Sequence, residues 1–380
     1  MAAALMSTLA AGLIGALCWR TWWSIGFAFA VPILVGLQSR RAWALGIAVV
    51  YFATASWPLV RAYAAFAGTT MMAGCLAWIV AAVVLALPLT FAWTRNRTAA
   101  GWRIPIALAI GVLPPFGLIG WASPVASAGV LFPGTAWFGL AAAILAPGLL
   151  LLGRPLICIA VGVASLLSFC LSKPVPPPSA WAAIETNLVP GRRFEGADEL
   201  IASDTIQKVV SDSRAAVTVL PETVISRWTE ATEAFWEPTL AELHRQRRLA
   251  IIGAGLAIPD SPAYGNAALI IGGERPQAFF QRVPVPVGMW RPFGTGPSVP
   301  LHLGRPGTIE VAGQRVAFLI CYEQLLVLPV LLSAIDRPTL IVGMANQYWV
   351  RETSIPAAQR ASLTAWSRLF ALPLLIAENR

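Results

Sequence analysis

The sequence predicts a protein of two unlike parts: an α-helical membrane bundle of about seven spans, followed by an α/β domain. Hydrophobic residues make up 57% of the 380-residue chain and charged residues 12%, and no acidic residue occurs before residue 185. Strand and helix patterns alternate from residue 181 onward, which is typical of an α/β fold. We therefore expect a transmembrane bundle over residues 1–172, a stiff proline-rich linker over 173–180 and a globular domain over 181–380.

The positive charge of the chain belongs entirely to its first part. The formal net charge is +9, whereas the residues after 184 carry equal numbers of basic and acidic side chains. The basic residues of the first part stand singly or in pairs between apolar runs; they are Arg20, Arg40, Arg41, Arg61, Arg95, Arg97, Arg103, Arg154 and Lys173. Such scattering does not form a basic patch, so no direct nucleic-acid partner is expected.

Apolar runs between these arginines are interpreted as membrane spans. Most approach the roughly 20 residues that cross a bilayer. Ten of the 16 tryptophans lie in residues 1–172, many near the ends of the runs, as in interfacial aromatic belts. The predicted spans are 4–19, 21–38, 42–60, 69–93, 104–121, 134–152 and 155–172.

The distribution of arginines predicts the orientation in a bacterial inner membrane. If the N-terminus is cytoplasmic, the inside loops hold six arginines and the outside loops hold Arg20 and Arg61 alone. The positive-inside rule favours this arrangement, and seven spans would then place the C-terminal domain in the periplasm. The Pro- and Gly-rich stretch 113–134 is either a re-entrant loop or an outside loop that dips into the interface.

The globular part has the pattern of a packed sheet with covering helices. No Gly-rich phosphate loop or Gly-x-Ser-x-Gly elbow occurs, and the only histidines, His244 and His302, lack metal-ligand spacing. We therefore expect no metal and no cofactor. The predicted strands are 181–187, 216–220, 249–255, 266–272, 278–285, 315–321, 338–343 and 372–377, and the predicted helices are 197–212, 234–247, 324–334 and 355–370.

Two strands of this part end in residues that carry chemistry. The apolar run 216–220 leads into Pro221 and Glu222, and the run 315–320 ends at Cys321, the only cysteine after residue 184. A carboxylate close to a thiol can take its proton as the sulfur attacks an acyl carbon. Taken singly, the cysteine is more often an inert core residue and the glutamate a turn residue or helix cap. The pair in this order predicts a base and a nucleophile.

On these motifs the sequence resembles the nitrilase, or carbon–nitrogen hydrolase, superfamily. The resemblance is to the branch with an N-terminal membrane bundle, the apolipoprotein N-acyltransferases, and extends to membrane proteins of plasmid conjugal transfer. It implies a four-layer αββα sandwich, with Glu222 as base and Cys321 as nucleophile of a thioester intermediate. It also implies substrate-binding roles for a further set of residues: Tyr322, Glu323, Asn346, Trp349 and Trp290.

The sequence departs from this family at the third catalytic residue, a lysine. Aligning Val285–Gly288 with the family's Val-Pro-Phe-Gly segment places Gln281 at the lysine position, with Arg282 beside it. Met289 stands where the family has a glutamate, and both lysines of the chain precede Glu222. Arg282 offers fixed positive charge but no transferable proton, and Gln281 offers a neutral hydrogen bond. Losing one oxyanion donor typically costs on the order of 10²–10³ in rate.

Three functions remain open on the sequence. The first is a membrane enzyme of plasmid conjugal transfer that acts on an acyl or amide group, with a membrane lipid as acyl donor; a true apolipoprotein N-acyltransferase is one form of it. The second is an inactive nitrilase-like module that contacts other conjugal transfer proteins. The third is a transporter, which is disfavoured because residues 1–184 contain no acidic residue or histidine for a proton relay.

Overall fold

The computed structural model describes residues 1–188, 197–258, 262–292, 294 and 298–380. The chain divides into two compact units. The first comprises Met1–Val175, Leu325–Leu331 and Glu352–Leu372, and the second comprises Pro176–Gln324, Leu332–Arg351 and Pro373–Arg380. Two short segments from the C-terminal half of the sequence thus belong to the first, helical unit.

The first unit is built from helices. Those of Met1–Val175 are α1 (Ala2–Cys18), η1 (Trp23–Phe29), α2 (Ala30–Gly36), α3 (Arg41–Ser56), α4 (Leu59–Ala67), α5 (Met71–Ala92), α6 (Arg97–Val112), α7 (Phe116–Ile119), η2 (Pro124–Ser127), α8 (Ala128–Leu131), α9 (Ala136–Leu151) and α10 (Pro155–Leu171). From the C-terminal half this unit adds α14 (Ile355–Phe370) and the beginning of α13 (Val327–Ile335).

Short polar residues and one glycine define how these helices begin and pack. The side chains of Thr70 and Asn96 cap α5 and α6 by accepting hydrogen bonds from backbone N–H groups three residues later. Helices α1 and α3 approach closely at Gly15, where a Cβ would lie 2.4 Å from the carbonyl oxygen of Tyr51. Only glycine permits that contact, as in other closely packed apolar helices.

The prediction of about seven membrane spans is wrong. In the described part of the chain, α5 alone is long and apolar enough to cross a bilayer, and α3 with α4 adds a second candidate if that pair, bent by 56°, counts as one span. The other apolar helices have 17 residues or fewer. At about 1.5 Å per residue, such a helix is shorter than the roughly 30 Å hydrocarbon core. The predicted span 104–121 is divided, because α6 ends at Val112, before Pro114 and Pro115.

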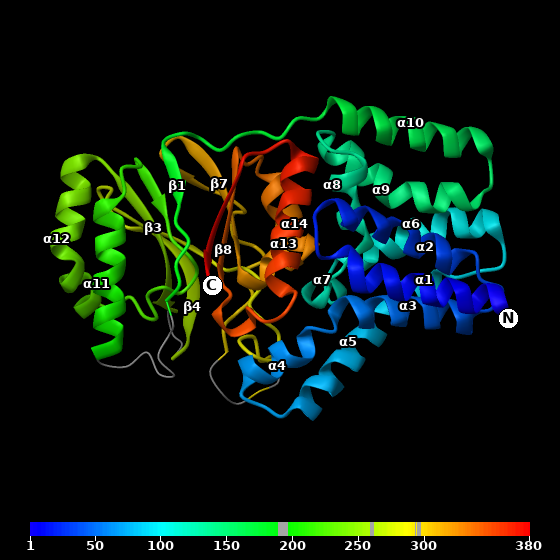
Figure 1. The fold of residues 1–380 in the computed structure, drawn as a ribbon, viewed down its shortest axis with the longest axis horizontal. Helices are drawn as coiled ribbons and strands as arrows, with labels where there is room; N and C mark the ends of the chain where they lie inside the picture. Colours follow the sequence, from blue (N-terminus) through cyan, green and yellow to red (C-terminus); the bar gives the residue numbers. More distant parts are fainter. Residues whose placement is uncertain (189–196, 259–261, 293, 295–297) are drawn as a thin grey trace. The chain divides into compact units, whose positions relative to one another are not determined.

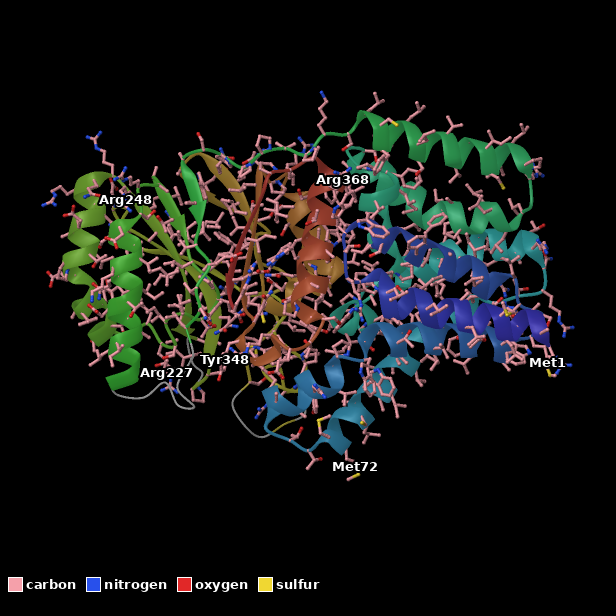
Figure 2. All side chains as sticks on the ribbon, in the orientation of Figure 1. Met1, Met72, Arg227, Arg248, Tyr348 and Arg368 are labelled. Atoms are coloured by element: carbon pink, nitrogen blue, oxygen red, sulfur yellow. The ribbon has the colours of Figure 1, made fainter. Side chains whose placement is uncertain are left out.

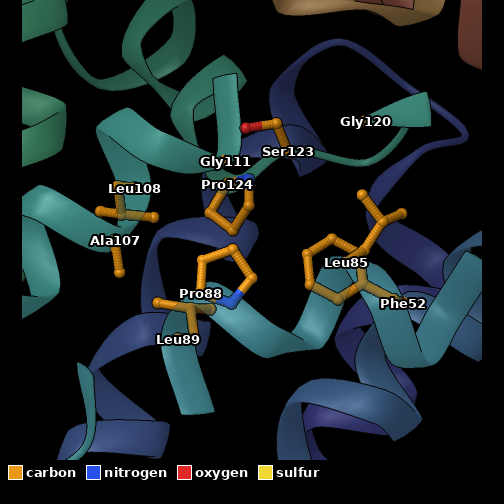
Figure 3. A pocket seen from close by; sticks show the side chains of 10 residues that line it. All are labelled: Phe52, Leu85, Pro88, Leu89, Ala107, Leu108, Gly111, Gly120, Ser123 and Pro124. Carbon is orange, nitrogen blue, oxygen red and sulfur yellow. The ribbon is translucent and has the colours of Figure 1, made fainter. Parts of the chain in front are cut away.

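Hydrogen bonds to backbone carbonyls join distant segments in the interior of the first unit. The Tyr51 hydroxyl donates to the carbonyl oxygen of Ala122 at 2.8 Å, and the Trp93 indole N–H donates to that of Gln38 at 3.0 Å. A small, mostly apolar pocket lies beside Pro88 of α5, and the Ser123 side chain is on its rim (Figure 3). Pro88 lies within α5 and removes one backbone donor from that helix.

The second unit contains two β-sheets. One has the strand order β1 (Trp181–Ala183), β2 (Val217–Val219), β3 (Leu249–Ala257), β4 (Tyr264–Ile271) and β5 (Gln277–Phe280). The other has the order β6 (Ile309–Val311), β7 (Gln314–Ile320), β8 (Leu340–Asn346) and β9 (Leu374–Asn379). Strands β1–β3 run parallel, as do β7–β9, and the remaining neighbours are antiparallel.

The two sheets pack face to face around one apolar core. Buried residues of both sheets, among them Val219, Ile251, Phe318 and Val342, form a single cluster, and side chains fill the space between the sheets (Figure 2). Helices α11 (Ala197–Asp212) and α12 (Glu230–Gln246) lie side by side on the outer face of the first sheet (Figure 1). In this unit the layers are therefore helix, sheet and sheet, whereas α14 belongs to the first unit.

Candidate active site

Glu222 and Cys321 occupy sharp turns at the ends of two strands. Strand β7 stops at Ile320, and Cys321 takes a left-handed conformation with φ of 53° before the short helix η3 (Cys321–Leu325). After β2, Thr223 has φ of 50°. Left-handed backbone is uncommon for residues with a Cβ and is concentrated at functional sites. Each turn lifts a reactive side chain out of the regular pattern of its strand.

The structure brings these two side chains together from different sheets. The Cys321 thiol is hydrogen-bonded to the Glu222 carboxyl, and both residues are buried, with 7% and 6% of their surface exposed. The carboxyl oxygens also accept hydrogen bonds from Asn266 Nδ2 at 2.6 Å and from the backbone N–H of Asn346 at 2.9 Å. Each of the two carboxylate oxygens of Glu222 therefore accepts a hydrogen bond that fixes its position.

Burial determines the acidity of both groups. Removal from water raises the pKa of Glu222 to about 7, and the nearby charge of Glu323 adds to the rise. The hydrogen bonds from Asn346, Cys321 and Asn266 limit this increase in pKa. Burial and the adjacent Glu222 charge raise the pKa of the Cys321 thiol well above its ordinary value. The resting pair thus holds a protonated thiol beside a carboxyl that titrates near neutral pH.

Gln281 lies beside this pair. Its Nε2 donates to the carbonyl oxygen of Ile320 at 3.1 Å, and its Oε1 accepts from Asn266 Nδ2 at 3.3 Å. The second Nε2–H group has no hydrogen-bond partner among the described residues. Gln281 is 1% exposed, so this donor is held next to the nucleophile in a site that excludes most water.

Arg282 and Glu323 form an ion pair, and Glu323 also accepts hydrogen bonds from the surrounding backbone. Glu323 accepts hydrogen bonds from the N–H groups of Arg282, Val283 and Ile320 at 2.8, 3.1 and 3.0 Å. The Arg282 guanidinium lies 3.8 Å from the Glu323 carboxylate and donates to Ser333 Oγ at 2.9 Å. These contacts tie the turn at Cys321 to the segment after β5. The structure thus shows Arg282 paired with Glu323 and Gln281 beside Glu222.

The other predicted substrate-binding residues have different surroundings. Tyr322 follows the nucleophile, and its backbone N–H hydrogen-bonds the Cys321 sulfur, while burial raises the pKa of its own hydroxyl. Asn346 ends β8. Trp349 is half-buried in η4 (Tyr348–Val350), directly after β8. Trp290 closes a tight turn by donating its backbone N–H to Val285.

Sequence reasoning missed three residues that support the site. Asn266 of β4 contacts Glu222 and Gln281 directly. Gly253 of β3 lies so close to the base that a Cβ there would be 2.2 Å from the Pro221 carbonyl oxygen. Asn379 of β9 donates to the side-chain oxygen of Asn346 at 3.0 Å. A signal was present for Asn266, because its polar side chain interrupts an otherwise apolar strand, where the structure leaves it half-buried.

The second unit and its paired thiol and carboxyl define the class: an α/β protein with a cysteine–glutamate site, joined to an apolar helical unit. A probable conjugal transfer protein TraB of Sinorhizobium fredii is 32% identical, over 98% of this chain and 97% of its own length. A conjugal transfer protein TraB of Agrobacterium fabrum is 31% identical, over 93% and 87%. The chain belongs to the TraB family of conjugal transfer proteins.

Two further comparisons add little to this assignment. No protein-family model matches the chain. A mutant amidase of the nitrilase superfamily from Nesterenkonia is similar over 52% of this chain and 73% of its own, with 14% sequence identity and a TM-score of 0.32.

Proposed function

We propose that this TraB-family protein is a membrane-associated enzyme of plasmid conjugal transfer that transfers or hydrolyses an acyl group through Cys321. The observation that carries the proposal is the hydrogen-bonded Cys321–Glu222 pair, buried and held on a left-handed turn. A base that titrates near neutral pH, as Glu222 does, is well matched to accept a thiol proton. The nitrilase-like motifs in the sequence support the same chemistry.

The first half-reaction forms a thioester. Glu222 takes the Cys321 proton as the sulfur attacks the acyl carbon of an ester or amide. The carbonyl oxygen becomes an oxyanion, for which Gln281 Nε2 and the Tyr322 backbone N–H are the proposed donors. In the resting site these groups donate to the Ile320 carbonyl oxygen and to the Cys321 sulfur. The bond from carbon to the leaving oxygen or nitrogen then breaks, and the leaving group receives the proton from Glu222.

The second half-reaction releases the acyl group. Glu222 removes a proton from water or an amine as that acceptor attacks the thioester carbon. The carbon–sulfur bond breaks, and the proton returns from Glu222 to the Cys321 sulfur. Both the thiol and the carboxyl are thereby restored for the next turnover.

A membrane phospholipid is proposed as the acyl donor because the helical unit exposes a large apolar surface. Exposed apolar surface of this extent marks an interaction with membrane or protein. Helix α10 has one buried residue, Ser168, and exposes a run of large side chains: Leu156, Ile159, Val163, Leu166, Leu167, Phe169 and Leu171. The apolar surface of α5 is likewise exposed at Leu76, Ile79, Val80 and Phe91.

Intact mass spectrometry after incubation with phospholipid tests the proposal. Wild-type protein in detergent is expected to gain an acyl mass that hydroxylamine removes, and Cys321→Ala is expected to gain none. A variant at an exposed cysteine, Cys158→Ala, serves as the matched control and should acylate like the wild type. Absence of any adduct in folded wild-type protein would favour the alternative, an inactive module that contacts other conjugal transfer proteins. The neutral Gln281 at the lysine position is the observation that favours this alternative.

A further inference from the structure

Asn266 contacts the base, its turn and the neutral donor together. Its Nδ2 donates to Glu222 Oε1 at 2.6 Å and to Gln281 Oε1 at 3.3 Å, and its Oδ1 accepts from Thr223 Oγ1 at 3.1 Å. Its backbone carbonyl also accepts from the Gln281 N–H at 2.8 Å. All hydrogen-bonding atoms of the amide side chain are therefore engaged.

The partners of Asn266 permit one orientation of its amide. An ionised carboxylate accepts hydrogen bonds and cannot donate them, so the NH₂ group must face Glu222. That NH₂ group also meets the oxygen of Gln281, which leaves the Gln281 NH₂ to face the Ile320 carbonyl, an obligate acceptor. The orientation of one amide thus fixes the other, and Gln281 presents N–H groups toward the nucleophile's turn.

The backbone of Asn266 is held as firmly as its side chain. It lies in β4, where antiparallel pairing places it opposite Gly255 of β3. The neighbouring strand β5 pairs with β4 up to Phe280, and Gln281 follows directly. Glu222 is on the turn that leaves β2, on the other side of β3. A residue of a central strand therefore links the carboxylate of one loop to the amide of another.

We propose that Asn266 is a positioning residue that aims the Glu222 carboxylate at Cys321 and orients the Gln281 amide as a donor beside it. This inference rests on the proposed function, because it assigns Asn266 a role in the same reaction. It goes beyond that function by naming a residue that never touches the thiol. A hydrogen bond to the ionised carboxylate stabilises the charged form, which is the form that accepts the proton.

The test is the pH dependence of Cys321 alkylation by iodoacetamide, read by peptide mass spectrometry so that the other cysteines do not interfere. In Asn266→Ala, the midpoint of the rate profile is expected to rise by about one pH unit, since a hydrogen bond to a charged group is lost. Asn266→Asp preserves the shape of the side chain but adds a like charge, so its midpoint should rise further. Asn187→Ala, an exposed asparagine in the same unit, should keep the wild-type midpoint.

The variant Glu222→Gln distinguishes the positioning role of Asn266 from the assignment of Glu222 as the base. If Glu222 is the base, this variant should lose the neutral-pH midpoint altogether. An unchanged midpoint in Asn266→Ala and Asn266→Asp, with the midpoint lost in Glu222→Gln, would overturn the role of Asn266 and leave the base assignment intact. An unchanged profile in Glu222→Gln would overturn the base assignment and, with it, the inference. Asn266→Asp also remains informative if the alanine variant does not fold.

Discussion

At the scale of single residues, the site holds a neutral amide beside its thiol and carboxyl. Gln281 is buried, accepts from Asn266 and donates to the carbonyl oxygen before Cys321. An amide there can stabilise an oxyanion. Because it is neutral, it does not lower the pKa of the thiol as a cation would. The raised pKa values of Cys321 and Glu222 fit a site in which the thiol is protonated at rest and the base must take its proton during the attack.

Removing this amide tests its role as a donor. Gln281→Ala is expected to slow acylation of Cys321 on the order of 10²-fold, the usual effect of losing one oxyanion donor. Gln277→Ala, at an exposed glutamine that begins β5, the strand before Gln281, is the matched control and should acylate at the wild-type rate. The measurement is the rate at which the acyl mass appears. Equal rates in the two variants would remove Gln281 from the mechanism.

The raised pKa of Glu222 predicts that the free energy of unfolding falls as the pH rises. Its pKa of about 7 in the folded protein lies above the ordinary value of 4.5, so the native state binds this proton more tightly than the unfolded chain. The resulting stabilisation is present in full below the unfolded-state pKa and is lost as the pH rises through the folded-state value. A glutamine at position 222 does not titrate, so the stability of the Glu222→Gln variant does not change with pH through this group.

The stability of Glu222→Gln relative to the wild type should therefore increase between about pH 5 and about pH 8, by up to about 3 kcal/mol. Unfolding temperatures of the two proteins in the same detergent, compared at both pH values, measure this change. A difference that stays constant with pH would mean that Glu222 has an ordinary pKa in the folded protein.

At the scale of elements, strand spacing sets the geometry of the base. Strand β3 passes the turn after β2 so closely that Gly253 lies against Pro221 and Glu222. Gly253→Ala is expected to displace this turn, to destabilise the protein on the order of 1–3 kcal/mol, and to slow Cys321 alkylation at neutral pH. Gly304→Ala, where no atom lies within 4 Å of the new Cβ, should change neither property. Equal behaviour of the two variants would show that the close approach has no role at the base.

The periodicity of the sequence predicted most elements of the second unit, and helix α14 of the first unit. Helices 197–212 and 355–370 are confirmed to the residue, and the expected strands appear within a few residues of their predicted ends. The predicted strand 278–285 stops at Phe280, before Pro284 and Pro286, which cannot donate to a sheet. The strand Ile309–Val311 was missed because three residues give no periodic signal.

The site was only partly readable from the sequence. Cys321 and Glu222 follow apolar strands, so their positions at strand ends could be predicted. That they face each other from two packed sheets depends on the sandwich and not on local pattern. Asn266 acquires its role from the register of β4, and Gln281 from the place where β5 stops. The pattern of a single segment does not show which residues of other strands it will meet in the fold.

At the scale of the whole molecule, the length of an apolar run did not give the length of a helix. Residues 42–60 form one such run, yet the helix bends at Trp57 and Pro58 between α3 and α4. The predicted number of spans failed mainly because the apolar helices other than α5 have 17 residues or fewer, and the argument from an odd number of spans fails with it. The clustering of Arg95, Arg97 and Arg103 still favours a cytoplasmic location for that segment.

Alkaline phosphatase fusions test which side of the membrane each unit faces, because this enzyme is active only outside the cytoplasm. A fusion after Arg97 is expected to be inactive, and a fusion after Arg380 is expected to be active if the second unit is periplasmic. Reporter activity normalised to the amount of fusion protein is the measurement. Activity of the Arg97 fusion alone would reverse the proposed orientation.

The hydrogen bond between Asn379 and Asn346 has a consequence for the order of events during synthesis. The N–H of Asn346 holds Glu222, and Asn379 in turn holds Asn346 and the segment at Thr186 and Leu188. The ribosome makes the thiol of Cys321 nearly sixty residues before it makes Asn379. While the chain is being translated, the nucleophile therefore exists without its finished surroundings, and it gains a fully anchored partner only when the last strand is added.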